Sequence, residues 1–181
     1  MHYLSSQEMN LRSGSGQQLV TAVEETATTN TLWLLRGPND PESRDDGTSA
    51  CTKEGTGEKI RCGSVVRMTH LNTMKNLHSH PVQSALSNQR EVTAFGQGDM
   101  KGDGGDDWRV LCSTDYWMRK ENVQFEHVET GKFLGASSTV KFTHQNCGRN
   151  CPIMNHLEVF GRSTKDQYSR WMVDMGIHLS K

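Results

Sequence analysis

Short segments of alternating apolar and polar residues recur along the chain, as in Val66–Thr69, Glu91–Phe95 and Trp108–Leu111. Alternation with a period of two puts the apolar side chains on one face of a β-strand, and the Gly, Asn, Asp and Ser residues between the segments favour turns. An amphipathic helix needs a period of 3.6, and no such stripe continues along the chain. The pattern therefore predicts an all-β fold with almost no helix.

The alternating segments belong to a repeat. Four residues recur at one offset of 57 (127 − 70): His70, Thr73, Lys75 and Leu77 match His127, Thr130, Lys132 and Leu134. A partial copy comes first, in which Tyr3–Ser6 and Gly16–Thr21 resemble Asn76–Ser79 and Asn88–Thr93. Each copy ends on a tryptophan, at Trp33, Trp108 and Trp171, for which core packing is the favoured role. The chain therefore contains three copies of one unit.

Three copies of about four strands each predict a closed architecture. A hairpin pair alone cannot bury its apolar face or protect its edge strands, whereas a threefold barrel does both. We expect one β-trefoil domain over residues 1–181, with repeats at about 1–60, 61–117 and 118–181. If Leu4 corresponds to Leu77, then Met1 falls at Met74, so we expect the first strand of repeat one to be missing.

The chain is close to electrically neutral, with 20 Lys and Arg against 21 Asp and Glu. Because it has no basic cluster, neither nucleic acid nor an anionic bilayer is expected as a partner. No apolar run approaches the roughly 20 residues that span a bilayer, and Leu32–Leu35 is the longest notable cluster. The composition predicts a soluble chain without a membrane span, and we expect a monomer.

The five cysteines are Cys51, Cys62, Cys112, Cys147 and Cys151. A Gly-rich turn separates Cys51 from Cys62, which predicts a disulfide worth about 3 kcal/mol from the entropy of loop closure. Cys147 and Cys151 flank a tight loop, which predicts a second disulfide worth about 2 kcal/mol. Metal binding through this last pair is disfavoured because the C-x3-C spacing is loose. Cys112 remains either as a thiol that has lost its partner or as a buried free cysteine.

No metal, cofactor or catalytic site is expected. His78 and His80 face the same side of a strand, but no third ligand is evident in the sequence, so hydrogen bonding is favoured over metal binding. Four acids stand close together in Gln97–Asp107, but this segment lacks the spacing and the distal Glu of an EF-hand and is interpreted as a solvated turn. The neighbours that a nucleophile elbow, an HExxH motif or a Cys-His arrangement requires are also absent from the sequence.

Several motifs taken together resemble MIR repeats. They are Leu77–His80, the turns Gly14–Thr21 and Asn88–Gly96, Asp106–Trp108 and Val110–Cys112. On these motifs the chain is similar to the stromal cell-derived factor 2-like family nearly from end to end. The resemblance implies a β-trefoil of three MIR repeats, residence in the endoplasmic reticulum lumen, and a non-enzymatic role in protein quality control. The implied partners are an Hsp40-type co-chaperone, an Hsp70-type chaperone, and unfolded or O-mannosylated client chains.

Two features depart from the family pattern. Leu4–Gln7 reads Leu-Ser-Ser-Gln where the family has Leu-His-Ser-His, and Gly176–Lys181 carries no KDEL-like signal. The endoplasmic reticulum, or secretion, is therefore expected from the resemblance and from two disulfides, which imply an oxidising compartment. MIR repeats also occur in protein O-mannosyltransferases, so the resemblance leaves open a second function as a lectin-like module that binds a glycan or an O-mannosyl peptide.

Repeat two is the expected ligand-binding repeat, because it combines two imidazoles with a polar turn, whereas repeat three has Gly135–Ala136 at the imidazole positions. Amide, guanidinium and carboxylate groups at a strand rim orient hydroxyl-rich or peptide ligands. Glu91 and Glu158 occupy matching repeat positions, which favours a structural or binding role over catalysis. The candidate ligand-binding residues are His78, Ser79, His80, Gln89, Arg90 and Glu91, with Gln17 and Gln18 from the related turn of repeat one.

Overall fold

The computed structural model describes residues 1–24, 28–38, 59–98 and 101–175. The strands are β1 (Tyr3–Asn10), β2 (Gln18–Val23), β3 (Trp33–Arg36), β4 (Val65–His70), β5 (Asn76–Gln83), β6 (Arg90–Phe95), β7 (Trp108–Leu111), β8 (Gln124–His127), β9 (Phe133–Lys141) and β10 (Leu157–Arg162). Helix in the described ranges is limited to α1 (His144–Cys147) and the 3-10 turns η1 (Thr29–Thr31), η3 (Gly104–Asp106) and η4 (Gln167–Ser169). The predicted all-β class is confirmed.

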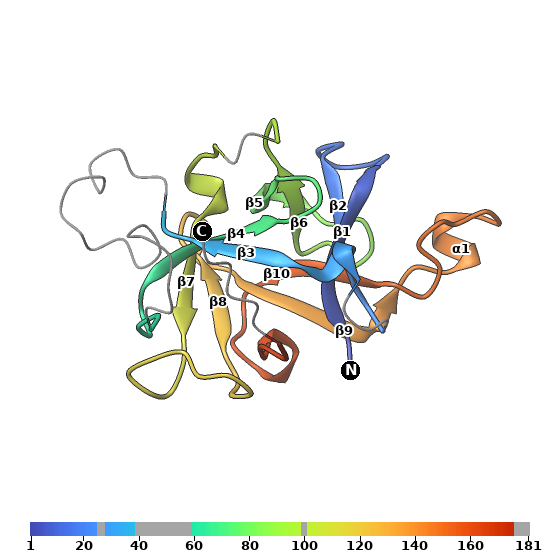
Figure 1. Cartoon of the computed structure of the whole chain (residues 1–181). Helices are drawn as coiled ribbons and strands as arrows, with labels where there is room; N and C mark the ends of the chain where they lie inside the picture. The colour runs from blue at the N-terminus through green and yellow to red at the C-terminus, as the bar shows by residue number, and fades with distance from the viewer. Residues whose placement is uncertain (25–27, 39–58, 99–100, 176–181) are drawn as a thin grey trace.

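The strands form one antiparallel sheet that closes on itself (Figure 1). The ring runs from β10 through β6, β5, β4, β7, β8 and β9 and back to β10. Strands β2, β6 and β10 also pair with one another, while β1 pairs with β2 and β3 with β4. No helix in the described part of the chain is long and apolar enough to cross a membrane.

The apolar positions of the alternating segments fill the interior of the ring. Alternation supplies each strand with an inward face, so residues far apart in sequence meet in one cluster. The members with no measurable exposure are Val66, Leu77, Ala94, Trp108, Val110 and Leu134. Trp117 packs beside this cluster with its ring centroid 5.3 Å from that of Phe125. Its position is therefore that of a core residue and not that of an exposed carbohydrate platform.

The three recurring tryptophans make the same hydrogen bond. In each repeat the indole Nε1 donates to the backbone carbonyl of a leucine at 2.9–3.0 Å: Trp33 to Leu4, Trp108 to Leu77 and Trp171 to Leu134. A 3-10 turn precedes each tryptophan, and these turns are η1, η3 and η4. The bond satisfies the polar end of a large buried ring, which agrees with the packing role predicted for these residues.

His70 and His127 are buried, and neither makes an ion pair with a described residue. In each ring Nε2 donates to a backbone carbonyl, of Asn30 and Gly105 respectively, and Nδ1 lies 2.9 Å from the hydroxyl of the threonine three residues later. Burial lowers the pKa of both imidazoles below the ordinary 6.5, although the backbone carbonyls act in the opposite direction. Both rings are therefore neutral in the folded protein near pH 7.

We expect the melting temperature to fall as the pH is lowered from 7.5 to 5. The folded-state pKa values of His70 and His127 lie below the unfolded value, so their contribution is complete above about pH 6.5 and is lost as the pH falls toward the lowered pKa. Thermal melts at intervals of half a pH unit test this. The control is His144→Gln on exposed α1, which should leave the pH dependence unchanged. A flat profile above pH 5 would contradict the prediction.

The predicted Cys51–Cys62 disulfide is wrong, because Cys62 bonds to Cys112. Cys51 itself lies outside the described residues.

The register of β4 on β7 explains the actual pairing. Val65 lies opposite Arg109 in this antiparallel pair, and three residues further out on both strands Cys62 faces Cys112. Their Cα atoms are 5.4 Å apart, a normal separation for a disulfide. Cys112 is therefore neither a free thiol nor one that has lost its partner.

The predicted Cys147–Cys151 disulfide is present. It lies in the long connection between β9 and β10, and Figure 1 shows α1 projecting from one end of these strands. Both cysteines pack against a second small apolar cluster formed by Leu19, Phe142 and Ile153. The disulfide thus braces an insert whose own apolar core is small.

Candidate functional site

A polar surface lies over the β5–β6 hairpin, on the face opposite the core. His78 pairs directly with Thr93 across the two strands, and alternation places His80 on the same side as His78. The imidazole centroids of His78 and His80 are 5.1 Å apart, and the Phe95 ring lies 4.9 Å from that of His78. The residues predicted to bind a ligand thus fall around one hairpin, but most of their polar atoms already have partners.

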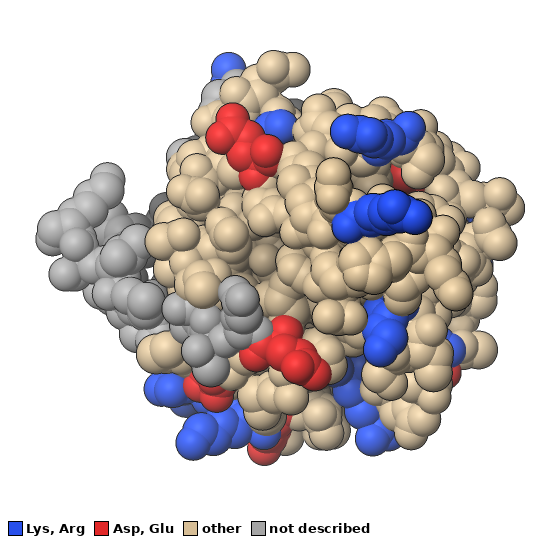
Figure 2. Space-filling model, turned by 90° about the vertical axis from the view of Figure 1, so that its right-hand side faces the viewer, with Lys and Arg blue, Asp and Glu red and all other residues tan. Residues whose placement is uncertain are grey.

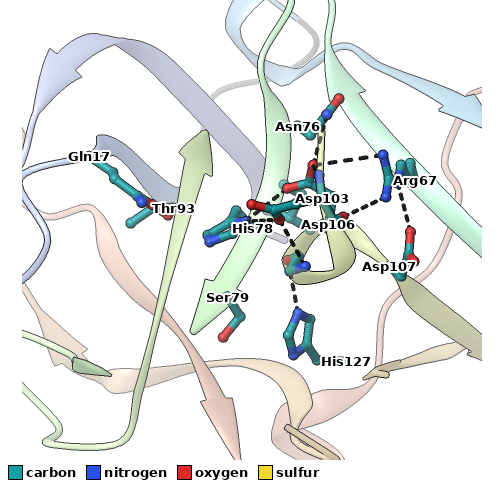
Figure 3. A network of polar contacts seen from close by, with 12 residues as sticks. Gln17, Arg67, Asn76, His78, Ser79, Thr93, Asp103, Asp106, Asp107 and His127 are labelled. Carbon is teal, nitrogen blue, oxygen red and sulfur yellow. Dashed lines mark hydrogen bonds and ion pairs between the residues drawn. The ribbon is translucent and has the colours of Figure 1, made fainter. Parts of the chain in front are cut away.

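His78 contacts the acidic turn that was predicted from the sequence to be solvated. Its Nδ1 lies 2.9 Å from Asp106 Oδ1 and 3.6 Å from Asp103 Oδ1, both in or beside η3 (Figure 3). Asp106 is fully buried, and its other oxygen accepts hydrogen bonds from Asn76 Nδ2 at 3.0 Å and from the Asp103 backbone N–H at 3.1 Å. The interpretation of this loop as a solvated turn is therefore wrong for Asp106.

A buried arginine closes the other side of the turn. Arg67 is 2% exposed, its Nε donates to Asp107 Oδ1 at 2.6 Å, and its Nη2 donates to the Asp103 carbonyl. Its Nη1 has no hydrogen-bond acceptor in the described ranges and lies 4.0 Å from Asp106 Oδ2. A buried guanidinium requires a nearby carboxylate, and Asp107 supplies it directly.

His80 and Glu91 form a second imidazole–carboxylate pair. His80 Nε2 lies 2.9 Å from Glu91 Oε2, and the same carboxylate accepts from the Ser15 hydroxyl and backbone N–H. Burial raises the pKa of Glu91, but the hydrogen bonds from His80 and Ser15 outweigh it and hold the pKa below its ordinary value. Gly14 allows this approach, because a Cβ there would fall 2.0 Å from Glu91 Oε1. Glu91 therefore anchors the β1–β2 turn to repeat two.

The equivalent glutamate makes the equivalent contact one repeat later. Glu158 accepts from the backbone N–H groups of Leu86 and Ser87 at 2.6 and 2.9 Å, and so anchors the β5–β6 turn to repeat three. Leu19 occupies the matching position in repeat one and packs on the β9–β10 insert through Phe142. The cavity where these hairpins meet measures about 10 Å³, which leaves room for no more than one water molecule.

The other candidate residues divide into buried and accessible ones. Ser79 is fully buried and donates to the Glu91 carbonyl, while Gln18 is 1% exposed and its amide donates to the Ser6 and Thr73 hydroxyls. Gln17 Oε1 accepts from the Thr93 hydroxyl at 2.5 Å and is partly exposed. Gln89 and Arg90 are also partly exposed, and the Arg90 side chain makes no hydrogen bond or ion pair with described residues.

Asp103 and Asp106 were not predicted as site residues. Their position before Trp108 identifies them, because each of the three recurring tryptophans follows a capped 3-10 turn. The first residue of that cap is Thr28, Asp103 or Asp166, and the last residue of the turn is Thr31, Asp106 or Ser169. Aligning the repeats backwards from the tryptophans brings out the two aspartates.

Acidic and basic side chains are mixed on the visible surface, in agreement with the balanced composition. On the face in Figure 2, acidic and basic side chains are distributed singly or in small groups among uncharged residues. That face therefore lacks the continuous positive surface that a nucleic-acid backbone requires.

Comparison with known proteins identifies the class of domain and then the family. The MIR domain family matches residues 2–124. Mouse stromal cell-derived factor 2-like protein 1 is 39% identical over 97% of this chain and 71% of its own length. Human stromal cell-derived factor 2 is 38% identical over 97% of this chain and 74% of its own length. The chain therefore belongs to the stromal cell-derived factor 2-like family of MIR-domain proteins.

Solved structures share the architecture. The SDF2-like protein from Arabidopsis thaliana has a TM-score of 0.78 at 28% identity, over 98% of this chain and 88% of that chain. A Caenorhabditis elegans protein has a TM-score of 0.80 at 36% identity, over 97% and 88%. The Saccharomyces cerevisiae protein O-mannosyltransferase Pmt1-Pmt2 complex bound to the sugar donor reaches 0.74 at 24% identity, over 93% of this chain and 22% of that chain, which is a likeness of fold alone.

Proposed function

We propose that the protein is a non-catalytic adaptor of the endoplasmic reticulum lumen that acts in protein quality control with an Hsp40-type co-chaperone and an Hsp70-type chaperone. The observation that carries the proposal is 39% identity over 97% of the chain to a stromal cell-derived factor 2-like protein, because the family resemblance implies this role. The Cys62–Cys112 and Cys147–Cys151 disulfides support an oxidising compartment.

The proposed architecture behind this role is a β-trefoil of three MIR repeats in one domain over residues 1–181, divided near residues 60 and 117. Three features support it. Strands β2, β6 and β10 pair mutually, the three tryptophans make equivalent bonds, and each hairpin turn is held by the neighbouring repeat through Glu91, Glu158 or Leu19. Such a domain presents rigid surface turns for binding and needs no active site.

Affinity capture from an extract of the endoplasmic reticulum lumen tests the proposed adaptor role. Immobilised protein should retain the Hsp40-type and Hsp70-type chaperones together with unfolded clients, identified by mass spectrometry. Arg90→Glu should reduce client capture, because Arg90 is accessible and its side chain has no partner among described residues. Lys165→Glu makes the same charge change on exposed surface in repeat three and should have no effect. Capture of neither chaperone nor client would reject the adaptor role.

A second candidate is binding of a glycan or an O-mannosyl peptide. The polar face over β5 and β6, with Gln17 and His80 partly exposed, offers amide and imidazole groups that orient hydroxyl-rich ligands, and the partly exposed guanidinium of Arg90 lies at the start of β6. In the capture experiment, this second candidate predicts that glycans or glycopeptides are retained and chaperones are not. On a glycan array, Arg90→Glu would abolish glycan binding.

A further inference from the structure

Two sequence patterns that were rejected separately as metal sites meet in the fold. The first is the His78–His80 pair, which lacked a third ligand, and the second is the acidic turn before Trp108, which lacked the spacing of a calcium loop. Pairing of β5 with β6 and packing of η3 beside them bring His78 to Asp103 and Asp106 (Figure 3). Each of these three residues offers one ligand atom, and the three atoms lie within 4.8 Å of one another.

Two of the three separations between these atoms are close to those of ligands on a zinc ion. Ligands about 2.0–2.1 Å from a tetrahedral zinc are roughly 3.4 Å from each other. His78 Nδ1 lies 2.9 Å from Asp106 Oδ1 and 3.6 Å from Asp103 Oδ1, on either side of that value, and the two carboxylate oxygens lie within 4.8 Å of each other. Side-chain rotation would bring all three atoms to one ion. We propose that His78, Asp103 and Asp106 form a binding site for a divalent transition-metal ion of the zinc type.

The donor set determines the class of ion. One imidazole nitrogen and two carboxylate oxygens, with water completing the coordination, suit Zn²⁺, whereas Ca²⁺ and Mg²⁺ favour oxygen ligands alone. The ion takes the position of the proton that His78 Nδ1 shares with Asp106 Oδ1. Metal binding therefore requires Nδ1 without its proton, which a neutral imidazole moves to Nε2 and a doubly protonated imidazole releases.

The groups around the ligands hold them in place. Asn76 Nδ2 and the Asp103 N–H orient Asp106, and the Gly105 N–H orients Asp103 Oδ1 at 2.9 Å. Gly105 also admits the imidazole, since a Cβ at this position would fall 2.3 Å from His78 Cε1. Outer groups of this kind fix the direction of metal ligands. The Asp103 side chain is 59% exposed, so an ion in solvent would meet this ligand first.

The other repeats show that the barrel does not need these ionisable groups. The residue after the leucine that receives the indole bond is Ser5 in repeat one and Gly135 in repeat three, where repeat two has His78. The position of Asp106 is occupied by Thr31 and Ser169, which close the same capped turn without a charge. Repeat two alone combines an imidazole with two carboxylates at this junction, so the combination is not a requirement of the repeat.

The nearby guanidinium groups cancel only part of the negative charge of the ligands. Arg67 Nε pairs with Asp107 at 2.6 Å while its Nη1 lies 4.0 Å from Asp106 Oδ2, and the charge of Arg36 also acts on Asp106. The carboxylates of Asp103, Asp106 and Asp107 therefore face two guanidinium groups, which leaves a net negative charge for a divalent ion. Arg67 Nη1 is buried and without an acceptor in the described part of the chain, and a water or anion accompanying the metal would supply one.

Zinc titration of chelator-treated protein, followed by isothermal calorimetry, tests the site. The wild-type protein should bind one equivalent of Zn²⁺ and gain thermal stability from it. Asp103→Asn should weaken zinc affinity at least about tenfold, the lower limit seen when even outer groups are removed. Asparagine caps a helical turn as well as aspartate does, so this change preserves the fold of η3. Asp166→Asn is the matched control, because Asp166 caps η4 in repeat three, belongs to no cluster of metal-ligating side chains among the described residues, and should leave zinc affinity unchanged.

The result that overturns the site is equal zinc affinity in the wild-type protein and Asp103→Asn, because surface histidines would then account for the binding. Absence of zinc binding by the wild-type protein, with Zn²⁺ at about 100 times the protein concentration, would also overturn it. His78→Gln should abolish binding, and if that variant fails to fold, the Asp103→Asn comparison still decides. The outcome is independent of the proposed adaptor role, since titration uses the isolated protein and no chaperone.

Discussion

The double variant Cys62→Ser/Cys112→Ser is expected to lose about 4 kcal/mol of unfolding free energy, the chain-entropy value for a loop of this length. The two cysteines are 50 residues apart, so the disulfide removes much of the freedom of the unfolded chain. It also ties the outer ends of β4 and β7, beyond Val65 and Arg109. Urea unfolding under non-reducing conditions, with and without the double substitution, measures the loss.

The matched comparison is Cys147→Ser/Cys151→Ser. These cysteines are only 4 residues apart, so the same relation predicts a loss of about 2 kcal/mol. The expected order is therefore a larger loss for the long loop than for the short one. Equal losses, or peptide mapping of the non-reduced protein that joined Cys62 to Cys51, would contradict the pairing on which this prediction is based.

Trp108→Ala is expected to destabilise the protein by about 4 kcal/mol, within the range for truncation of a buried tryptophan. Trp108 has no exposed surface, lies in the central cluster, and donates to the Leu77 carbonyl, which the substitution leaves without its partner. Trp33 and Trp171 make the same bond but are only partly buried. Their replacement by Ala should cause roughly half the loss, in proportion to the smaller apolar area that each buries.

Denaturant unfolding of the three single variants measures this difference. Trp108→Phe helps to separate the two contributions, because it keeps a six-membered ring in the core and removes the indole donor with the five-membered ring that carries it, for an expected loss of about 1–3 kcal/mol. Three equal losses from the Ala series would show that the hydrogen bond, and not the unequal burial, dominates the role of these tryptophans.

The strands were predictable because their signals are local. Period-two alternation depends only on neighbouring residues, and the segments around Val66, Val92 and Trp108 became β4, β6 and β7. The three tryptophans could be recognised as packing residues from their recurrence. The Cys147–Cys151 pairing was also accessible, since a separation of 4 residues leaves little choice of geometry.

The polar candidates were predicted only in part. Placing His78 and His80 on one strand face was sufficient to make them neighbours, and their rings are 5.1 Å apart. What the pattern did not show is that both imidazoles are bound to carboxylates, or that Ser79 and Gln18 are buried. Burial of a polar residue depends on which chain segments cover it, and those segments are distant in sequence.

The sequence by itself determined the all-β class and the strand positions of the candidate histidines, because these follow from short-range periodicity. Only the tertiary structure decided that Cys62 pairs with Cys112 and that His78 meets Asp103 and Asp106. Both contacts depend on register between strands and on closure of the barrel. A one-residue shift in register would turn each side chain to the opposite face, so no local pattern specifies such contacts.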